Sequence, residues 1–294
     1  MLAMNEKQEK DDERSKYVRS TGIEVKGMTN MLQYREKEVL ELQKVSWKRD
    51  GIRILSDINW QVNKGEHWAI LGLNGSGKTT LLNLINGYLW PTTGNISVLN
   101  QPFGKTDLRL LRKSIGWVSS SLQERIKETS LVEDVVLSGK YASIGLYDTP
   151  DKTDIEQAET LMEQLGFSHL KGRSYRTCSQ GEKQKILIAR GLMANPLLLI
   201  LDEPTTGLDF LAREDLLMSI EKMAEAEHAP TILFVTHHME EILPIFSHTL
   251  MLRDGQVFAE GETRSVITEN KLSTFFSIPV SIEWREGRAW MTRK

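Results

Sequence analysis

The chain has 294 residues, of which 40% are hydrophobic and 26% are charged, and its formal net charge is −3 at pH 7. This charge gives no electrostatic case for nucleic-acid binding. The single cysteine excludes an internal disulfide and a cysteine-cluster metal site. No apolar run reaches the roughly 20 residues that a membrane-spanning helix needs. The polar start of the chain does not resemble a signal peptide, so we expect a cytoplasmic protein.

Residues 1–38 read as a leader. The segment 5–16 mixes both charge signs with almost no apolar content, which favours disorder. Met28 and Met31 lie just ahead of the first strand-like run. The upstream part is therefore native, a non-native extension or the product of a mis-assigned start, and the sequence leaves these alternatives open.

The first third after the leader alternates short strands with turns. Asp50-Gly51 and 91–94 are turn sequences. The strand-like runs are residues 39–45, 52–60, 67–71, 95–99 and 115–118.

The pattern is helical from about residue 120 to 195, and strand-like runs then return. The helical runs are residues 131–137, 154–165 and 182–193. The later strand-like runs, which alternate with helical runs such as 210–226, are residues 197–201, 231–235 and 248–253. This alternation predicts parallel strands joined by crossover helices, and therefore an α/β fold with an inserted helical subdomain at about 120–195. Residues 262–294 predict a C-terminal helix and a hairpin around Glu286-Gly287.

Residues 72–79 fit the phosphate-binding loop pattern of Gly, four residues and Gly-Lys-Ser/Thr. Glycines let successive N–H groups point into one small volume, and a following helix adds its positive end. Lys78 supplies a charge for the β and γ phosphates, and Thr79 a hydroxyl for Mg²⁺. The predicted nucleotide contacts are Gly72, Asn74, Gly75, Ser76, Gly77, Lys78, Thr79 and Thr80.

Two carboxylates follow the apolar run 197–201. Ligands bind at the carboxyl ends of buried parallel strands. We expect Asp202 to lie beside the Mg²⁺ bound by Thr79, and Glu203 to polarise the attacking water. His237, at the end of another buried strand, can reach the γ-phosphate from a second direction, whereas His238 reads as a solvated turn residue.

A third segment, Cys178–Glu182, precedes a helix. Ser179 can cap this helix, and the loop can present N–H groups and a hydroxyl to an anion. A helix N-terminus lowers the pKa of a nearby thiol, so Cys178 is either a reactive marker of the site or a buried, inert thiol.

The order of these motifs resembles the nucleotide-binding domain of ATP-binding cassette proteins, over about residues 39–261. The resemblance implies a P-loop NTPase (RecA-like) parallel sheet with an antiparallel β subdomain and an inserted helical subdomain. It implies that 72–80 is the Walker A loop, 197–202 the Walker B strand and 207–209 the D-loop. Glu203 is then the catalytic carboxylate and His237 the switch histidine.

By the same resemblance, residues 178–182 occupy the signature position. Two such domains dimerise head to tail in this family, and Ser179 and Gly181 then act on the γ-phosphate bound by the partner. The family usually has Leu-Ser-Gly-Gly-Gln at this position, so Cys178, Gln180 and Glu182 depart from the pattern.

Two further departures leave alternatives open. The family usually has an aromatic residue that stacks on adenine shortly before Walker A, and this chain has Arg49 at the aligned position. Trp47 lies two residues away on the same face of the strand, and either side chain could stack on the base. The glutamine that senses Mg²⁺ and links the site to the membrane partner is missing after residue 118. Either Ser120 takes that position, which we favour, or Gln123 substitutes after a loop adjustment.

The resemblance implies an ATPase subunit that uses ATP and Mg²⁺ and pairs with a second cassette, a homodimer or a close relative. It would power a separate membrane permease, with import expected, and would lie at the inner face of the cell membrane. The tail looks similar to those of metal, siderophore and molybdate importer ATPases. The alternatives are a soluble cassette ATPase acting on nucleic acid or ribosomes, which a basic surface stripe would favour, and a kinase.

Overall fold

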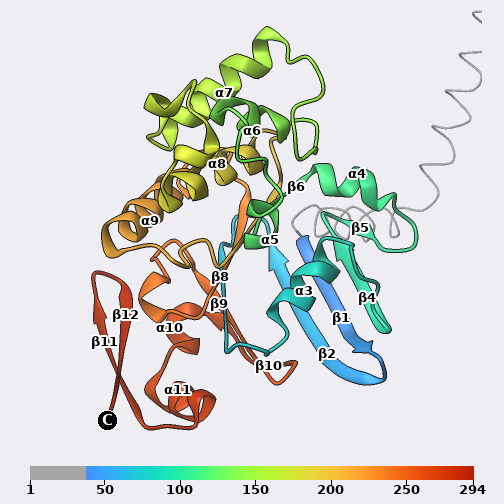
Figure 1. Ribbon diagram of the computed structural model, residues 1–294. Coiled ribbons are helices and arrows are strands. Elements are labelled where there is room, and N and C mark those ends of the chain that lie inside the picture. The colour runs from blue at the N-terminus through green and yellow to red at the C-terminus, as the bar shows by residue number, and fades with distance from the viewer. Residues whose placement is uncertain (1–37) are drawn as a thin grey trace, which may run out of the picture. The chain divides into compact units, whose positions relative to one another are not determined.

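The computed structural model describes residues 38–294 (Figure 1). The expected leader lies outside the described residues except for Glu38. Among residues 38–294, no helix is both long and apolar enough to cross a membrane.

The centre of this part is a six-stranded sheet with the order β10-β9-β3-β8-β7-β6. Strands β9, β3, β8, β7 and β6 run parallel, and β10 is antiparallel to β9. The expected parallel core is confirmed, although β10 was not anticipated as a strand. The strands are β3 (Trp68–Gly72), β6 (Ile115–Val118), β7 (Leu198–Asp202), β8 (Thr231–Thr236), β9 (His248–Arg253) and β10 (Gln256–Glu262).

A second, four-stranded sheet has the order β2-β1-β4-β5. Strands β1 and β4 are antiparallel, and their register shifts between Gln43 and Ser46. Gly94 sits in this irregularity with φ of 90°, and a Cβ there would overlap the backbone oxygen of Lys44. The strands are β1 (Glu38–Arg49), β2 (Ile52–Asn63), β4 (Thr93–Val98) and β5 (Gln101–Pro102).

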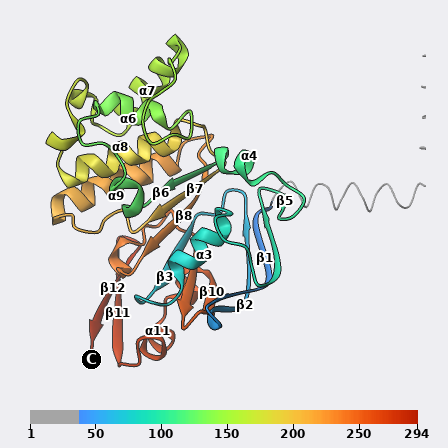
Figure 2. The same cartoon turned by 45° about the vertical axis from the view of Figure 1, so that its right-hand side comes forward.

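The parallel sheet separates two apolar cores because its strands alternate in the face that they present. Ile70 and Ile200 pack with the antiparallel sheet and with α3 (Lys78–Ile85). Leu71 and Leu201 pack with the helices on the other face. In Figure 2, α3 and helices α6 to α9 accordingly lie on opposite sides of β6–β8.

Three of the helices on that second face begin at a capping side chain. Asp151, Ser179 and Asp209 each accept a hydrogen bond from a backbone N–H in the first turn of the following helix. The helices between β6 and β8 are α5 (Ser120–Gln123), α6 (Val132–Ser138), α7 (Lys152–Gln164), α8 (Gln180–Leu192) and α9 (Phe210–Ala224), with α4 (Leu108–Lys113) ahead of β6. Short 3₁₀ turns are η1 (Ser168–Leu170), η2 (Tyr175–Thr177) and η3 (Met239–Glu241).

The C-terminal segment ends in a hairpin. Glu286 and Gly287 have φ of 48° and 78°, as a two-residue type I′ turn requires. Val280 and Ala289 are each only 1% exposed and belong to the same core as α6 to α9. The elements are α10 (Thr263–Val266), α11 (Glu269–Phe276), β11 (Val280–Arg285) and β12 (Arg288–Arg293).

Close contact between α6 and α8 gives a stability prediction. A Cβ at Gly139 would overlap the backbone oxygen of Arg190. We expect Gly139→Ala to lower the free energy of unfolding by about 2–4 kcal/mol, because the two helices must move apart. Gly191→Ala is the matched control, since its Cβ would meet other atoms no closer than 3.5 Å. Urea unfolding measures both, and equal stability of Gly139→Ala and the parent would contradict the packing.

Candidate functional site

The phosphate-binding loop connects the buried strand β3 to α3. Gly77 has φ of 102°, which favours glycine. A Cβ at Gly72 would lie 2.5 Å from Ser76 Oγ and 2.9 Å from the backbone oxygen of Leu252. Ser76 Oγ is buried and has no hydrogen-bond partner among the described residues. The loop is thus a tight cradle with a hydroxyl available to donate to a phosphate oxygen.

Lys78, the first residue of α3, is only 7% exposed. Its Nζ donates to the backbone oxygen of Gly72 at 2.8 Å and lies 3.3 Å from Glu203 Oε1. A buried ammonium needs such partners. A phosphate oxygen offers the same negative charge as the Glu203 carboxylate, so Lys78 can exchange one for the other.

Three neighbouring strands bring the predicted groups together, because β8 lies between β3 and β7. Glu203 follows β7, and its backbone N–H donates to the carbonyl of Val235 at 3.0 Å. His237 follows β8, and its Nδ1 lies 3.7 Å from Glu203 Oε1. Glu203 has φ of 50°, a strained value for a residue with a side chain, and such strain gathers at functional sites.

Asp202, the last residue of β7, carries the strongest electrostatic perturbation of this site. Burial and the neighbouring Glu203 raise the pKa of Asp202 to about 6, although Lys78 acts in the opposite direction. The carboxylate is therefore held ionised at neutral pH in an environment that disfavours its charge, and a cation would relieve that cost.

The oxygen donors fit Mg²⁺. The exposed Thr79 and the carboxylate of Asp202 are hard ligands of the kind that Mg²⁺ prefers. Within residues 38–294, no group of three or more His, Cys, Asp or Glu side chains could hold a metal ion. A magnesium ion here would need phosphate oxygens and water for its remaining positions.

Sequence reasoning missed Glu241, in the η3 turn. Its Oε2 accepts hydrogen bonds from Thr205 Oγ1 at 2.8 Å and Thr236 Oγ1 at 2.5 Å, and the residue is 1% exposed. Glu241 thus joins the segment after Glu203 to the end of β8, just before His237. No local motif marks it, because its partners are brought together only by the sheet.

The signature segment has the expected cap. Ser179 Oγ accepts from the N–H of Glu182 at 3.3 Å, and Glu182 Oε2 accepts from the N–H of Ser179 at 2.6 Å. Gly181 is close to α9, where its Cβ would lie 3.1 Å from Ala212 Cβ. These contacts fix the start of α8.

Of the two alternatives for Cys178, the structure supports the buried thiol. The side chain is buried at 7% exposure. Burial, and then the charge of Glu182, raise the pKa of the Cys178 thiol and outweigh the lowering by Arg173 and Lys183. The alternative of a buried, inert thiol therefore describes this residue.

Gln123 and Ser120 are placed differently. Gln123 exchanges two side-chain amide hydrogen bonds with Gln180, at 3.0 and 3.1 Å, and accepts a third from Gln184 at 3.1 Å. Ser120 is exposed as the first residue of α5. It follows β6, whose Val118 pairs with Leu201 beside Asp202. Gln123 is thus directed to the signature helix, and either sensing role stays a prediction.

The two candidates for adenine stacking lie at the end of β1. Trp47 is half-buried and packs against the core of the antiparallel sheet. Arg49 is exposed, and its Nε lies 3.8 Å from Asp50 Oδ2. The stacking role of either side chain stays a prediction.

Residues 55–206 match the family model described as ABC transporter. The chain belongs to the ABC transporter family. An uncharacterised ABC transporter ATP-binding protein of Bacillus subtilis (strain 168), YlmA, is 51% identical over 87% of this chain and 97% of its own. The molybdate import ATP-binding protein MolC of Haemophilus influenzae is 33% identical over 77% of this chain and 83% of its own. The predicted family resemblance is therefore confirmed, and the chain is an ATP-binding cassette ATPase.

The fold is also similar to that of a solved ABC transporter component. The structure of cbiO1 from Clostridium perfringens, part of the ABC transporter complex cbiONQ, matches with a TM-score of 0.70 at 29% identity. The match covers 81% of this chain and 94% of cbiO1. The predicted P-loop NTPase architecture is thereby confirmed.

The raised pKa of Asp202 predicts a pH-dependent stability. The native state binds this proton more tightly than the unfolded chain, so the ionised carboxylate costs stability above about pH 6, and the cost vanishes below about pH 4. We expect Asp202→Asn to raise the free energy of unfolding of the nucleotide-free, Mg²⁺-free protein by about 1–3 kcal/mol at pH 8.

Denaturant unfolding at pH 8, 6 and 4.5 measures this difference, which should shrink as the pH falls. Asp50→Asn, at a side chain that is 91% exposed, is the matched control and should show no such gain. A less stable Asp202→Asn protein at pH 8 would contradict the burial argument.

Proposed function

We propose that this chain hydrolyses Mg-ATP at an interface between two cassettes and thereby powers a separate membrane permease. The observation that carries the proposal is the convergence of Lys78, Glu203 and His237 at the carboxyl ends of β3, β7 and β8. Lys78 supplies positive charge for a triphosphate, Glu203 a base for water, and His237 a second contact for the γ-phosphate.

The residues divide the chemistry. Amides of the loop 72–80 and Lys78 hold the β and γ phosphates. When Lys78 turns to phosphate, Glu203 Oε1 loses its contact and becomes free to polarise the attacking water. His237 binds the γ-phosphate from the end of β8. Thr79 and Asp202 hold Mg²⁺, which neutralises developing charge on the phosphate oxygens when bound.

A second cassette completes the site. Ser179 and Gly181 begin α8, which packs on the sheet face opposite to α3. We assign them to the γ-phosphate bound by a partner cassette. Phe210 and Leu211, directly after the segment 207–209, are 62% and 77% exposed and offer apolar area for that partner.

Two assignments keep their alternatives. Trp47 through its ring, or Arg49 through its planar guanidinium, stacks on adenine. Ser120, which we favour because it follows β6 beside the end of β7, senses Mg²⁺. Gln123 is the alternative, although its amide is engaged by Gln180 and Gln184.

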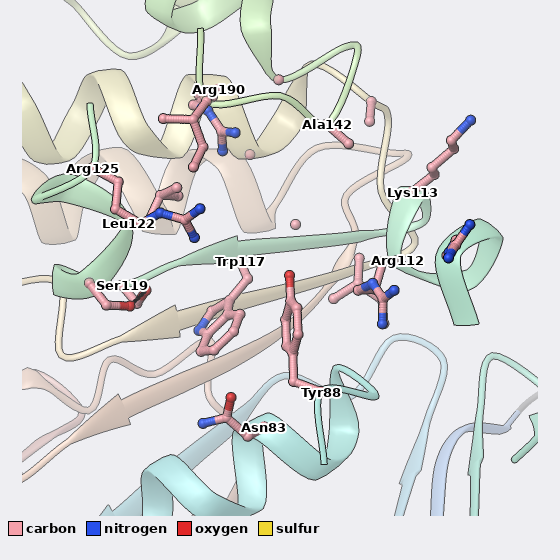
Figure 3. Close-up of a pocket in the computed structure, with 18 residues that line it drawn as sticks. Asn83, Tyr88, Arg112, Lys113, Trp117, Ser119, Leu122, Arg125, Ala142 and Arg190 are labelled. Carbon is pink, nitrogen blue, oxygen red and sulfur yellow. Dashed lines mark hydrogen bonds between the residues drawn. The ribbon is translucent and has the colours of Figure 1, made fainter. Parts of the chain in front are cut away.

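A basic pocket of about 700 Å³ supports a partner outside the nucleotide site (Figure 3). In Figure 3, Arg190 and Arg125 reach into it opposite Trp117 and Tyr88. Trp117 Nε1 is buried and has no hydrogen-bond partner among the described residues. The pocket is lined by no acidic residue, and its cations are Arg109, Arg112, Lys113, Arg125 and Arg190.

Nothing in the described part of the chain neutralises these five cations. Arg112 lies over the ring of Tyr88, and Arg190 donates to Ser138 Oγ and the carbonyl of Ser143. Burial lowers the pKa of the Arg190 guanidinium, as expected for a cation without a carboxylate. We propose that an acidic segment of the permease supplies the missing charge.

The relatives support transport, and import in particular. MolC is named as a molybdate import protein, and cbiO1 is part of a transporter complex. We propose import for this chain as well, and a location at the inner face of the cell membrane through its permease.

Substitution of the base tests the proposed chemistry. We expect Glu203→Gln to keep ATP affinity but lose at least about 100-fold in kcat, because water is no longer polarised. ATP should also trap this variant as a dimer in size-exclusion chromatography with light scattering. Lys78→Ala, the control, should bind no ATP and form no dimer. Hydrolysis by Glu203→Gln at the parental rate would refute the assignment.

Charge reversal tests the pocket. Arg112→Glu/Arg125→Glu should lower the membrane-associated share of the chain at least about tenfold in fractionated cells, because the acidic partner is then repelled. Lys64→Glu/Lys222→Glu, at exposed positions, makes the same change in net charge and should leave that share unaltered. An unaltered share in the arginine variant would contradict the proposal. Loss from the ribosomal pellet instead would favour an ATPase acting on ribosomes.

A further inference from the structure

The turn of the C-terminal hairpin lies against α9 and η3, which follow strands β7 and β8. Arg288, the first residue of β12, forms a bidentate pair with Glu214 on α9. Its Nη1 lies 2.6 Å from Glu214 Oε2, and its Nη2 lies 3.1 Å from Oε1. The two side chains are only 16% and 25% exposed, so this pair is partly shielded from water.

The same guanidinium has a third bond. Arg288 Nε donates to the backbone oxygen of Glu240 at 2.5 Å, and β12 packs on the η3 turn. The pair with Arg288 also lowers the pKa of the Glu214 carboxyl, so that this partner stays ionised. One planar group therefore fastens α9 and η3 to each other.

The η3 turn leads directly to the reacting groups. Glu240 Oε1 lies 3.6 Å from His238 Nδ1. Glu241 accepts the hydroxyls of Thr205 and Thr236, which stand two residues after Glu203 and one residue before His237. The contacts thus run from Arg288 through η3 to the segment that follows Glu203 and to the end of β8 before His237.

The packing of the hairpin holds Arg288 in place. Val280 and Ala289 are buried in the core shared with the helical face. The guanidinium of Arg264 lies 4.6 Å from the centre of the Trp284 ring. At Gly287 a Cβ would come within 2.8 Å of Pro244, so the turn is seated closely on the chain that follows η3.

We propose that Arg288 is a positioning residue for ATP hydrolysis: it holds η3 against α9 and so fixes His237 and Glu203 relative to each other. This inference rests on the proposed function, because it assigns the support of that same site to the C-terminal hairpin. Arg288 contacts Glu214 and the Glu240 backbone rather than the reacting groups Glu203 and His237. It acts through the Glu240 carbonyl and the Glu241 hydrogen bonds, and leaves the phosphate-binding loop unaltered.

The test separates kcat from KM. For Arg288→Ala we expect a loss of about tenfold to hundredfold in kcat, with KM for ATP within about twofold of the parent, because small displacements of reacting groups cost rate rather than binding. Each kcat is normalised to the ATP bound per mole of protein, and assays run well below the unfolding midpoint. Arg288→Lys keeps the positive charge but lacks the planar guanidinium that binds Glu214 through two nitrogens. Its kcat should therefore lie between those of Arg288→Ala and the parent.

Arg285→Ala is the matched control. Arg285 lies directly opposite Arg288 across the hairpin and pairs with the exposed Glu283. It should leave both constants within about twofold of the parent. Glu214→Gln should lose kcat as Arg288→Ala does, and the double variant should lose little more, as expected for residues that act together. Glu214→Gln and Arg288→Lys also provide the test if Arg288→Ala does not fold.

An unchanged normalised kcat in Arg288→Ala or Glu214→Gln would overturn the inference, and so would a fully additive double variant. A kcat loss that disappears on normalisation would also overturn it, because the residue would then be merely structural. If the parent protein itself fails to hydrolyse ATP, the proposed function is contradicted together with the inference. If the parent hydrolyses ATP and the variants do so equally well, only the inference about Arg288 is contradicted.

Discussion

The contact between Lys78 Nζ and Glu203 Oε1, at 3.3 Å, joins the two halves of this site. One group opens the helix after β3 and the other follows β7, with β8 and its His237 between them. The contact requires all three strands to be parallel and in register, so that their carboxyl ends meet at one edge. It also balances the charge of the buried Lys78 ammonium.

The sheet distributes further tasks to its two faces. One face packs against α3 and the antiparallel sheet, and so supports the phosphate-binding loop. The other packs against α6 to α9, which present Ser179, and against the C-terminal hairpin with Arg288. The basic pocket lies at the edge strand β6, with cations from both α4 and α8. The phosphate-binding loop, the signature segment, the basic pocket and the hairpin thus lie on different parts of the molecule that are joined by buried strands.

Sequence reasoning located the elements of the site where their residues lie close together along the chain. The phosphate loop at residues 72–79, the carboxylates after β7 and the cap of α8 each lie within a few residues of one another, so their spacing carries the signal. It failed where distant segments meet. Glu241, Arg288 and the cations of the pocket have no local pattern, because folding alone brings their partners together. For Cys178 the sequence left two alternatives open, and the structure favours the buried thiol because the effect of burial outweighs that of the helix terminus.

A crystal structure of the Glu203→Gln protein with Mg-ATP would show whether phosphate replaces residue 203 as the partner of Lys78. We expect Lys78 Nζ to leave residue 203 and to contact the β and γ phosphates, with Mg²⁺ held by Thr79 and Asp202. We also expect Ser179 of a second copy at the γ-phosphate. A triphosphate bound away from Lys78, or a complete site within one copy, would contradict these expectations.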